Sequence, residues 1–229
     1  MNKDKPAYHR IILKISGEVF SSSENLKLIC RQIIDAHNLG TEIGVVVGGG
    51  NIIRGKTTTG IDRKTADRIG LLSTIVNGLI LENALKKSAK VIHLAAFPVK
   101  GIVKPYSQEF AIESFKSNWI LVLSGGTGNL FFSTDTAAAL RAAELGADAV
   151  IKGTKVDGVY STDPQKNPKA VKYGKITFAQ ALNQELKIMD STAFALCQEN
   201  RIPIIVINVF QPNSLKKVLL GKKIGSAIC

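Results

Sequence analysis

The sequence has few cysteines and histidines, and neither residue type forms a cluster. Cys30, Cys197 and Cys229 lie far apart in a chain of 229 residues, and no C-x-x-C motif occurs among them. An odd and sparse set of this kind argues against a disulfide framework and against a zinc site built from cysteines. The 3 histidines are equally isolated. We therefore expect no metal ion held by protein ligands.

Long apolar runs are missing as well. No uninterrupted apolar stretch is long enough to span a bilayer. The first ten residues, MNKDKPAYHR, carry charges and lack the apolar region of a signal peptide. These absences lead us to expect a reduced protein that works in the cytoplasm and has no membrane partner.

The chain also lacks blocks of like charge, although it is strongly basic. Lys and Arg total 30 against 18 Asp and Glu, which gives a formal net charge of +12. Such a balance favours anionic partners, including phosphorylated metabolites and nucleic acid. A basic nucleic-acid-binding protein is therefore one hypothesis. The dispersed bases and the lack of an RRM, KH or helix-turn-helix signature argue against it.

Short β-rich runs alternate with longer helical patterns along the chain, of which 45% is hydrophobic. Strands that are apolar almost throughout are typical of a mainly parallel sheet buried on both faces, and the alternation places helices on both of those faces. We expect one domain that spans residues 1–229. Within it, the segment Gly153–Ala181 is expected to form hairpins or a flap that covers a site. The expected strands are Arg10–Ile15, Glu42–Val47, Lys90–Ala95, Trp119–Leu123, Ala147–Ile151 and Ile202–Asn208. The expected helices are approximately Glu24–Leu39, Ala66–Lys87, Thr134–Leu145 and Asp190–Asn200.

Several of these strands run into glycine-rich or polar turns. In open α/β sheets, ligands bind outside the carboxyl ends of the strands, where turns and helix N-termini present backbone N–H groups. The turns suit phosphates and sugar hydroxyls because they combine exposed N–H groups with lysine, arginine and hydroxyl side chains. They are Lys14–Glu18, Gly48–Asn51 with Arg54, Ser124–Asn129, and Lys152–Pro164.

One of these turns also matches the P-loop pattern G-x-x-x-x-G-K-[ST], from Gly50 to Thr57. A P-loop requires a helix that begins at the Lys-Thr pair. Here Lys56-Thr57 is followed by Thr58, Thr59 and Gly60, which are poor material for a first helical turn. We therefore expect the match to be accidental. No G-x-G-x-x-G follows the first strand, and no G-x-S-x-G surrounds Ser124, which argues against a dinucleotide-binding site and a nucleophilic serine.

Taken together, the turns resemble the amino acid kinase fold, and most closely the bacterial uridylate (UMP) kinases of that superfamily. The resemblance extends over nearly the whole chain, and the order and spacing of its pieces make it specific. The pieces are Lys14–Glu18, Gly48–Asn51 with Arg54-Gly55, Asp67 with Gly70, Gly126–Asn129, Phe131–Asp135, Thr154–Tyr160, Asp163-Pro164 and Leu186–Asp190.

The resemblance implies a three-layer αβα sandwich, a homohexamer, and transfer of the ATP γ-phosphoryl group to UMP, with Mg²⁺ carried by the ATP phosphates and water. It also implies that the N-terminal part mainly binds UMP and that the part from about residue 150 to 229 mainly binds ATP. The implied ATP-binding residues are Lys14, Ile15, Ser16, Gly17, Gly50, Arg54, Thr154, Tyr160 and Asp163. The implied UMP-binding residues are Gly49, Asp67, Thr127, Gly128, Asn129, Leu130, Phe131, Phe132, Ser133 and Thr134.

Catalysis by such a site should rest on positioning and on neutralisation of charge. The attacking phosphate oxygen is already anionic at neutral pH, so no strong general base is needed. We expect Lys14 and Arg54 to neutralise the transferring group, and Asp190 either to orient the lysine or to cap the helix that follows it. A kinase of the same fold that acts on a carboxylate or carbamate is the nearest alternative.

Overall fold

A computed structural model of the chain describes residues 5–53, 60–164, 166–186 and 188–229. In these residues a nine-stranded sheet has the strand order β4-β3-β5-β2-β1-β6-β10-β11-β9. All neighbouring strands pair in parallel except β10 and β11, which are antiparallel. The described strands of this sheet are β1 (Arg10–Ile15), β2 (Glu42–Val47), β3 (Val91–Ala95), β4 (Lys104–Pro105), β5 (Ile120–Ser124), β6 (Ala149–Thr154), β9 (Lys175–Ile176), β10 (Ile204–Asn208) and β11 (Ser226–Ile228). An antiparallel hairpin of β7 (Val159–Tyr160) and β8 (Lys172–Tyr173) stands beside it.

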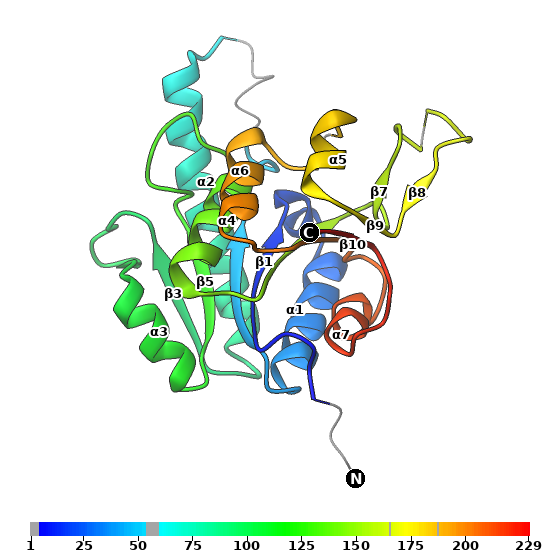
Figure 1. The fold of residues 1–229 in the computed structure, drawn as a ribbon. Coiled ribbons are helices and arrows are strands. Elements are labelled where there is room, and N and C mark those ends of the chain that lie inside the picture. The colour runs from blue at the N-terminus through cyan, green and yellow to red at the C-terminus, as the bar shows by residue number, and fades with distance from the viewer. Residues whose placement is uncertain (1–4, 54–59, 165, 187) are drawn as a thin grey trace.

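Helices cover both faces of the sheet, as Figure 1 shows. On one face, apolar side chains of α1, α2 and α7 pack with strand residues such as Ile11 and Leu13. On the other face, α3, α4, α5 and α6 pack with strand residues such as Ile12 and Leu121. The helices are η1 (Gly17–Ser21), α1 (Ser23–His37), α2 (Arg63–Leu85), α3 (Gln108–Lys116), α4 (Thr134–Leu145), α5 (Phe178–Asn183), α6 (Ser191–Glu199) and α7 (Ser214–Leu219). The expected three-layer αβα sandwich around a mainly parallel sheet is therefore confirmed.

The packing follows from the alternation of side chains along each strand. Successive residues of β1 point to opposite faces, so Ile11 and Leu13 enter one core while Ile12 enters the other. Both cores are made mainly of buried aliphatic side chains, and the core on the α3–α6 side also contains Phe115, Phe178 and Phe194. Burial of both faces is why these strands contain nearly unbroken apolar sequence.

The sequence-based strand and helix boundaries are correct for β1, β2 and α4, and other elements differ. The strand expected at Ala147–Ile151 instead spans Ala149–Thr154, because β10 pairs with it as far as the Asn208–Thr154 pair. The hairpin expected within Gly153–Ala181 is confirmed by β7 and β8, and the segment also contains β9 and the start of α5. The short elements α3, α5, α7 and β11 were not predicted.

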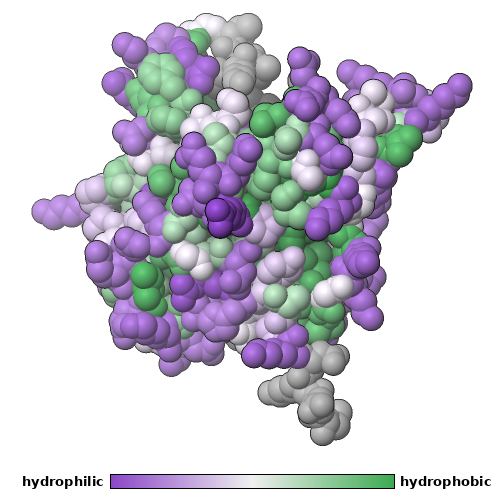
Figure 2. Space-filling model, in the orientation of Figure 1, coloured by the Kyte–Doolittle hydropathy of each residue, from purple (hydrophilic) through white to green (hydrophobic). Residues whose placement is uncertain are grey.

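The face drawn in Figure 2 is mainly hydrophilic, with apolar patches between the polar side chains. Within the described residues, no helix combines the length and the apolar character that crossing a membrane requires.

Candidate active site

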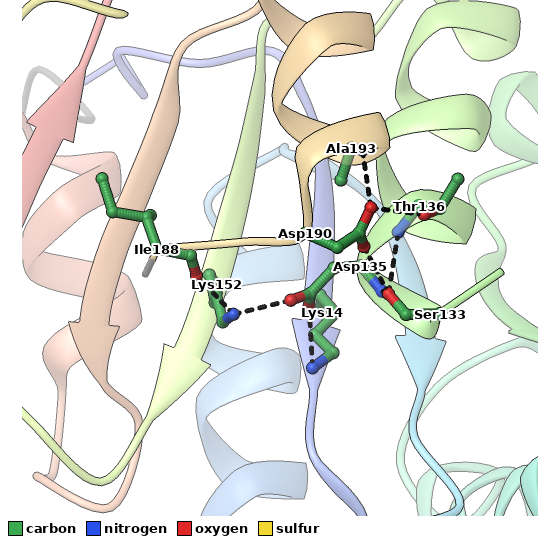
Figure 3. Close-up of polar contacts among 8 residues, drawn as sticks. All are labelled: Lys14, Ser133, Asp135, Thr136, Lys152, Ile188, Asp190 and Ala193. Atoms are coloured by element: carbon green, nitrogen blue, oxygen red, sulfur yellow. Dashed lines mark hydrogen bonds and ion pairs between the residues drawn. The ribbon is translucent and has the colours of Figure 1, made fainter. Parts of the chain in front are cut away.

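Two lysines and one aspartate form a buried charged cluster at the carboxyl end of the central strands. The Nζ atom of Lys14 lies 2.9 Å from the Asp135 carboxylate, and the Nζ atom of Lys152 lies 2.7 Å from its other oxygen. Figure 3 shows the aspartate between the two ammonium groups. The arrangement places two positive charges on either side of one buried carboxylate.

The fold itself brings these side chains together. Lys14 on β1 and Lys152 on β6 are register partners in neighbouring parallel strands, so their side chains leave the sheet side by side. Asp135 lies in the first turn of α4, which begins directly after its N-cap, Ser133. The Ser133 hydroxyl accepts hydrogen bonds from the backbone N–H groups of Asp135 and Thr136, which fixes the helix start against the strand ends.

Burial and charge shift the pKa values within the cluster. Burial raises the pKa of Asp135, but attraction to Lys14 and Lys152 outweighs it, and the pKa lies below the usual aspartate value. Burial lowers the pKa of Lys152, and the nearby Asp135 carboxylate offsets only part of that effect. Asp135 therefore stays ionised at neutral pH and supports the charge of Lys152.

Asp190 has a different place from the one expected. Its carboxylate accepts hydrogen bonds from the Thr136 hydroxyl at 2.8 Å and from the backbone N–H of Ala193 at 2.9 Å, and also from the Ser133 hydroxyl. It is the N-cap of α6 and ties this helix to the start of α4 (Figure 3). The capping interpretation is thus confirmed, and the carboxylate against Lys14 is that of Asp135.

A cavity of about 570 Å³ lies next to the lysine cluster and contains several of the predicted ATP-binding residues. Lys152, Thr154, Tyr160 and Asp163 line it, together with apolar side chains such as Ile188. The volume and the mixture of apolar and polar groups suit a nucleotide base and sugar. The predicted ATP residues on β6, on β7 and after β7 are therefore brought to one cavity.

The remaining predicted ATP residues lie on glycine-rich turns. Ile15 ends β1, Ser16 and Gly17 follow it, and a side chain at Gly17 would lie 2.4 Å from the Asn51 side-chain oxygen. This turn therefore packs directly on the turn after β2, which contains Gly50. Arg54, Lys56 and Thr57 lie outside the described residues.

A second cavity of about 120 Å³ contains part of the predicted UMP site. The predicted UMP residues lining it are Gly49, Asp67, Asn129, Phe132 and Thr134, and Gly50, which was predicted to bind ATP, lines it as well. Gly49 allows α2 to come close, since a Cβ atom there would lie 2.8 Å from the Ser73 Cβ atom. The cavity thus lies between the turn after β2, the start of α2 and the loop before α4.

Asp67 already has hydrogen-bond partners in this cavity. Its carboxylate accepts a hydrogen bond from the backbone N–H of Phe131 at 2.8 Å and faces the Arg63 Nε atom at 2.9 Å. Thr127 organises the loop locally through a hydrogen bond from the Asn129 backbone N–H. The other predicted residues, Gly128, Leu130 and Ser133, belong to the same loop. Phe131 and Phe132 are 58% and 48% exposed, so their rings are accessible to a ligand.

Buried polar side chains contact the start of this loop, at Ser124 and Gly125. The Nε2 atom of His93 lies 2.7 Å from the Ser124 hydroxyl, and its Nδ1 atom lies 3.9 Å from the Glu82 carboxylate. The Thr74 hydroxyl accepts a hydrogen bond from the Gly125 backbone N–H. Burial lowers the His93 pKa to about 4, so its ring is neutral at physiological pH.

The sequence contained signals for some of the residues that were not assigned. Lys152 follows the predicted strand directly, and a parallel pairing of this strand with β1 would have placed it opposite Lys14. Asp135 enters the sequence analysis only as part of Phe131–Asp135 and has no assigned role, because nothing local shows that two lysines face it. His93 is a lone histidine in an apolar strand, and its contact with Ser124 depends entirely on tertiary structure.

Comparisons with known proteins agree with this geometry. Residues 9–208 match the model of the amino acid kinase family. The chain is 43% identical over 235 aligned residues to the uridylate kinase of Pseudoalteromonas atlantica, covering 98% of this chain and 95% of that protein. The structure is similar to the UMP kinase of Bacillus anthracis, with a TM-score of 0.94, 32% identity and coverage of 96% of each chain. It is also similar to the UMP kinase of Ureaplasma parvum, with a TM-score of 0.90, 38% identity and coverage of 96% of this chain and 98% of that one.

Proposed function

The chain belongs to the amino acid kinase family, and we propose that it acts there as a UMP kinase. The reaction transfers the γ-phosphoryl group of ATP to the phosphate of UMP, giving UDP and ADP for pyrimidine nucleotide synthesis in the cytoplasm. The observation that carries this proposal is the position of the Lys14–Asp135–Lys152 cluster. Lys152 lines the larger cavity, and Asp135 directly follows Thr134 of the smaller one. The charged cluster therefore lies where a donor and an acceptor phosphate would meet.

The two lysines supply most of the proposed catalysis. In the transition state, negative charge spreads over the oxygens of the transferring phosphoryl group, and fixed cations stabilise it. Lys14 and Lys152 approach from neighbouring strands and are only 12% and 17% exposed in their side chains. Because the surroundings are poorly hydrated, each ammonium group interacts with the phosphoryl oxygens more strongly than it would in water.

Asp135 and Asp190 act as positioning residues in this proposal. Asp135 reduces the repulsion between the two ammonium groups and holds both near one point. Asp190 fixes α6 against the start of α4 through Ser133 and Thr136. This contact aims the positive N-terminal end of α4 at the region between the cavities, which favours a bound phosphate.

MgATP is the proposed phosphoryl donor. Within the described part of the chain, no group of three or more His, Cys, Asp or Glu side chains is arranged to hold a metal ion. The Asp135 and Asp190 carboxylates are already engaged by lysine, hydroxyl and N–H groups. This donor set fits Mg²⁺ held by the ATP phosphates and water, which is how this ion is often bound in kinases.

UMP is proposed to bind between α2 and the loop before α4, with Asp67 at its nucleoside end. The cavity there measures about 120 Å³, well below the roughly 300 Å³ at which small-molecule sites usually begin. Binding of UMP would therefore move the start of α2 away from Phe132. The contacts that Asp67 now makes to Arg63 and Phe131 would be replaced by contacts to UMP.

We propose that the chain divides between the two substrates: residues from about 150 to 229 mainly bind ATP, and the N-terminal part mainly binds UMP. Arg54 is proposed as a further phosphate contact on the strength of the family resemblance.

The decisive experiment compares acceptors. Purified protein with MgATP is incubated with UMP, with glutamate or with carbamate, and the products are separated by chromatography. We expect UDP and ADP to form in equal amounts with UMP, and no turnover above background with the carboxylate and carbamate. Phosphorylation of glutamate or carbamate in place of UMP would establish the alternative kinase of the same fold.

We also infer that the protein assembles as a homohexamer in which the exposed face of α2 forms one of the subunit interfaces. Leu72, Val76 and Ile80 recur every four residues and are 52%, 47% and 41% exposed, forming one apolar stripe. A second copy of the same helix would bury this stripe symmetrically. Light scattering should give a hexamer for the natural protein and smaller species for Val76→Asp, with Lys90→Asp as a surface control. An unchanged mass for Val76→Asp would place the interface elsewhere.

A further inference from the structure

A third cavity of about 420 Å³ lies on the opposite face of the sheet from the proposed ATP cavity. The two cavities have neighbouring residues of β10 in their walls: Ile205 lines the third cavity, and Val206 lines the ATP cavity. Ile205 packs with the α1, α2 and α7 side of the molecule, and Val206 packs with the other side. The third cavity is thus separate from the substrate sites and has the sheet as a shared wall.

The lining of the third cavity combines apolar and cationic groups. Buried Ile205 and Val218 contribute apolar surface, together with the ring of Tyr8. Lys175, Lys222 and Lys223 are all exposed at this cavity. Among the described residues that line it, none is acidic. The wall therefore offers three cations without an opposing carboxylate.

The surrounding backbone is firmly held. The backbone N–H of Ala7 donates to the Leu219 carbonyl at 2.7 Å, which attaches the N-terminal segment to the end of α7. The Ala227 N–H donates to the Gly174 carbonyl at 3.0 Å, which attaches β11 to the loop before β9. A cavity whose edges are fixed in this way needs little reorganisation to receive a ligand.

We propose that the third cavity is a regulatory site for a small phosphorylated molecule with a flat apolar or aromatic body. The volume lies within the range of small-molecule sites, the apolar wall accommodates the body, and the lysines bind the phosphate as point charges. This ligand class also accounts for part of the excess of basic residues that the two substrate sites do not use.

Ser226 connects this site to the ATP cavity. Its hydroxyl accepts a hydrogen bond from the Val159 backbone N–H at 2.7 Å and donates to the Tyr173 carbonyl, so it holds both strands of the β7–β8 hairpin. Gly158 lines the ATP cavity, and a Cβ atom added to it would lie 2.5 Å from the Ser226 hydroxyl and 3.4 Å from the Gly225 carbonyl carbon. Gly225 in turn lines the third cavity. If a ligand shifts the backbone at Gly225, that displacement is therefore passed to the β7–β8 hairpin, which lies beside the proposed ATP site.

Pyridoxal 5′-phosphate is a suitable probe for the site, since it carries one phosphate on an aromatic ring. It forms a Schiff base with a nearby lysine, borohydride reduction makes the link permanent, and peptide mapping locates it. With saturating UMP and MgADP protecting the substrate sites, we expect at least one of Lys175, Lys222 and Lys223 to be labelled ten times faster than exposed lysines elsewhere. The internal controls are Lys90, Lys100 and Lys116.

A variant that fills the cavity separates binding from simple lysine reactivity. Gly174 lines the cavity and a Cβ atom there meets nothing within 4 Å, so Gly174→Phe should fold normally, place a ring at the edge of the cavity and leave every lysine in place. We expect it to slow the selective labelling at least fivefold. Thermal unfolding of the variant checks its fold. Labelling at the rate of the control lysines, or selective labelling that is unchanged in a folded Gly174→Phe protein, would overturn the proposed site.

The regulatory link is tested by ADP binding, which does not depend on the identity of the phosphoryl acceptor. Calorimetry should show at least a threefold change in the Kd for MgADP once the cavity lysines carry the reduced pyridoxyl phosphate. In Ser226→Ala the labelling should persist, whereas the change in Kd should disappear. An unchanged Kd in the selectively labelled natural protein would overturn the regulatory role. A failure of UMP phosphorylation would affect only the proposed function.

Discussion

The cavities on the two sides of the lysine pair differ in how far they are formed without substrate. The ATP-side cavity measures about 570 Å³ and is bounded by strand ends and by a hairpin that Ser226 holds. The UMP-side cavity measures about 120 Å³ and is closed by contacts of Asp67 with Arg63 and Phe131. The proposed ATP site is thus built into the sheet, and the proposed UMP site depends on how a helix and a loop approach each other.

The lysine cluster belongs to both sides, so its loss should have the largest effect. Lys14→Ala or Lys152→Ala should reduce kcat at least 10³-fold, equivalent to about 4 kcal/mol of barrier, because a fixed charge at the transferring group is removed. Lys155→Ala is the matched control, since this lysine is close in sequence and its side chain is 62% exposed. Steady-state kinetics with both substrates saturating should leave the control within threefold of the natural protein. A loss in only one lysine variant would mean that the two lysines do not act together.

Asp135→Asn should come next, with a loss of about 100-fold in kcat, or about 2.7 kcal/mol. The amide preserves the shape of the side chain but removes the negative charge between two ammonium groups. Because the carboxylate supports the charge of Lys152, its loss should lower the lysine pKa further. The rate should therefore decline at a lower pH on the alkaline side. A pH profile of the same shape as that of the natural enzyme would contradict this role for Asp135.

The fold could be predicted from the sequence where one element carries a complete local signal. The strands Arg10–Ile15 and Glu42–Val47 are mainly apolar runs that begin with a charged residue and end before a Ser-Gly or glycine turn, and Thr134–Leu145 has a serine N-cap and a terminal glycine. Ser226–Ile228 is too short to show a period and is a strand only because β9 and β10 pair with it. Local sequence therefore predicted the central elements and missed the edges.

The same distinction explains the outcome for the candidate site. Glycine turns after strands predicted both cavities, because glycine and hydroxyl patterns are local in sequence. The cluster of Lys14, Asp135 and Lys152 depends on how β1 and β6 are aligned, and these two strands are distant in the sequence. Of the two roles expected for Asp190, the structure shows the helix cap, whose signal is local, and gives the contact with Lys14 to Asp135 instead. Tertiary contacts between charges were the part that the sequence pattern could not reveal.

The buried histidine under the UMP-side loop provides a test through stability. Burial holds the pKa of His93 at about 4, below its ordinary value of 6.5, even though the Glu82 carboxylate acts in the opposite direction. Because the unfolded protein then binds a proton at His93 more readily than the folded protein does, the free energy of unfolding is highest above pH 6.5 and decreases as the pH falls towards 4. Between pH 7.5 and 5 this group alone should remove about 2 kcal/mol from the free energy of unfolding.

Urea unfolding at the two pH values measures this contribution. In His93→Gln the acid-dependent loss should be about 2 kcal/mol smaller, whereas His9→Gln, at an exposed position, should retain it. Groups shared by all three proteins cancel in this comparison. The same loss in His93→Gln as in the natural protein would remove His93 as a source of acid sensitivity on the UMP side.

Asp67→Asn should have the smallest effect and the most selective one. The amide can still accept the hydrogen bond from the Phe131 N–H, but it is a weaker acceptor than a carboxylate for the hydroxyl and N–H groups of a nucleoside. We expect the KM for UMP to rise about tenfold, or about 1.4 kcal/mol, while the KM for ATP stays within twofold. Asp35→Asn on α1 is the control, because it removes the same charge on a helix away from both cavities. Equal increases in both KM values would mean that the two cavities respond as one unit, since a change at the start of α2 would then reach a site formed by β6, β10 and the β7–β8 hairpin.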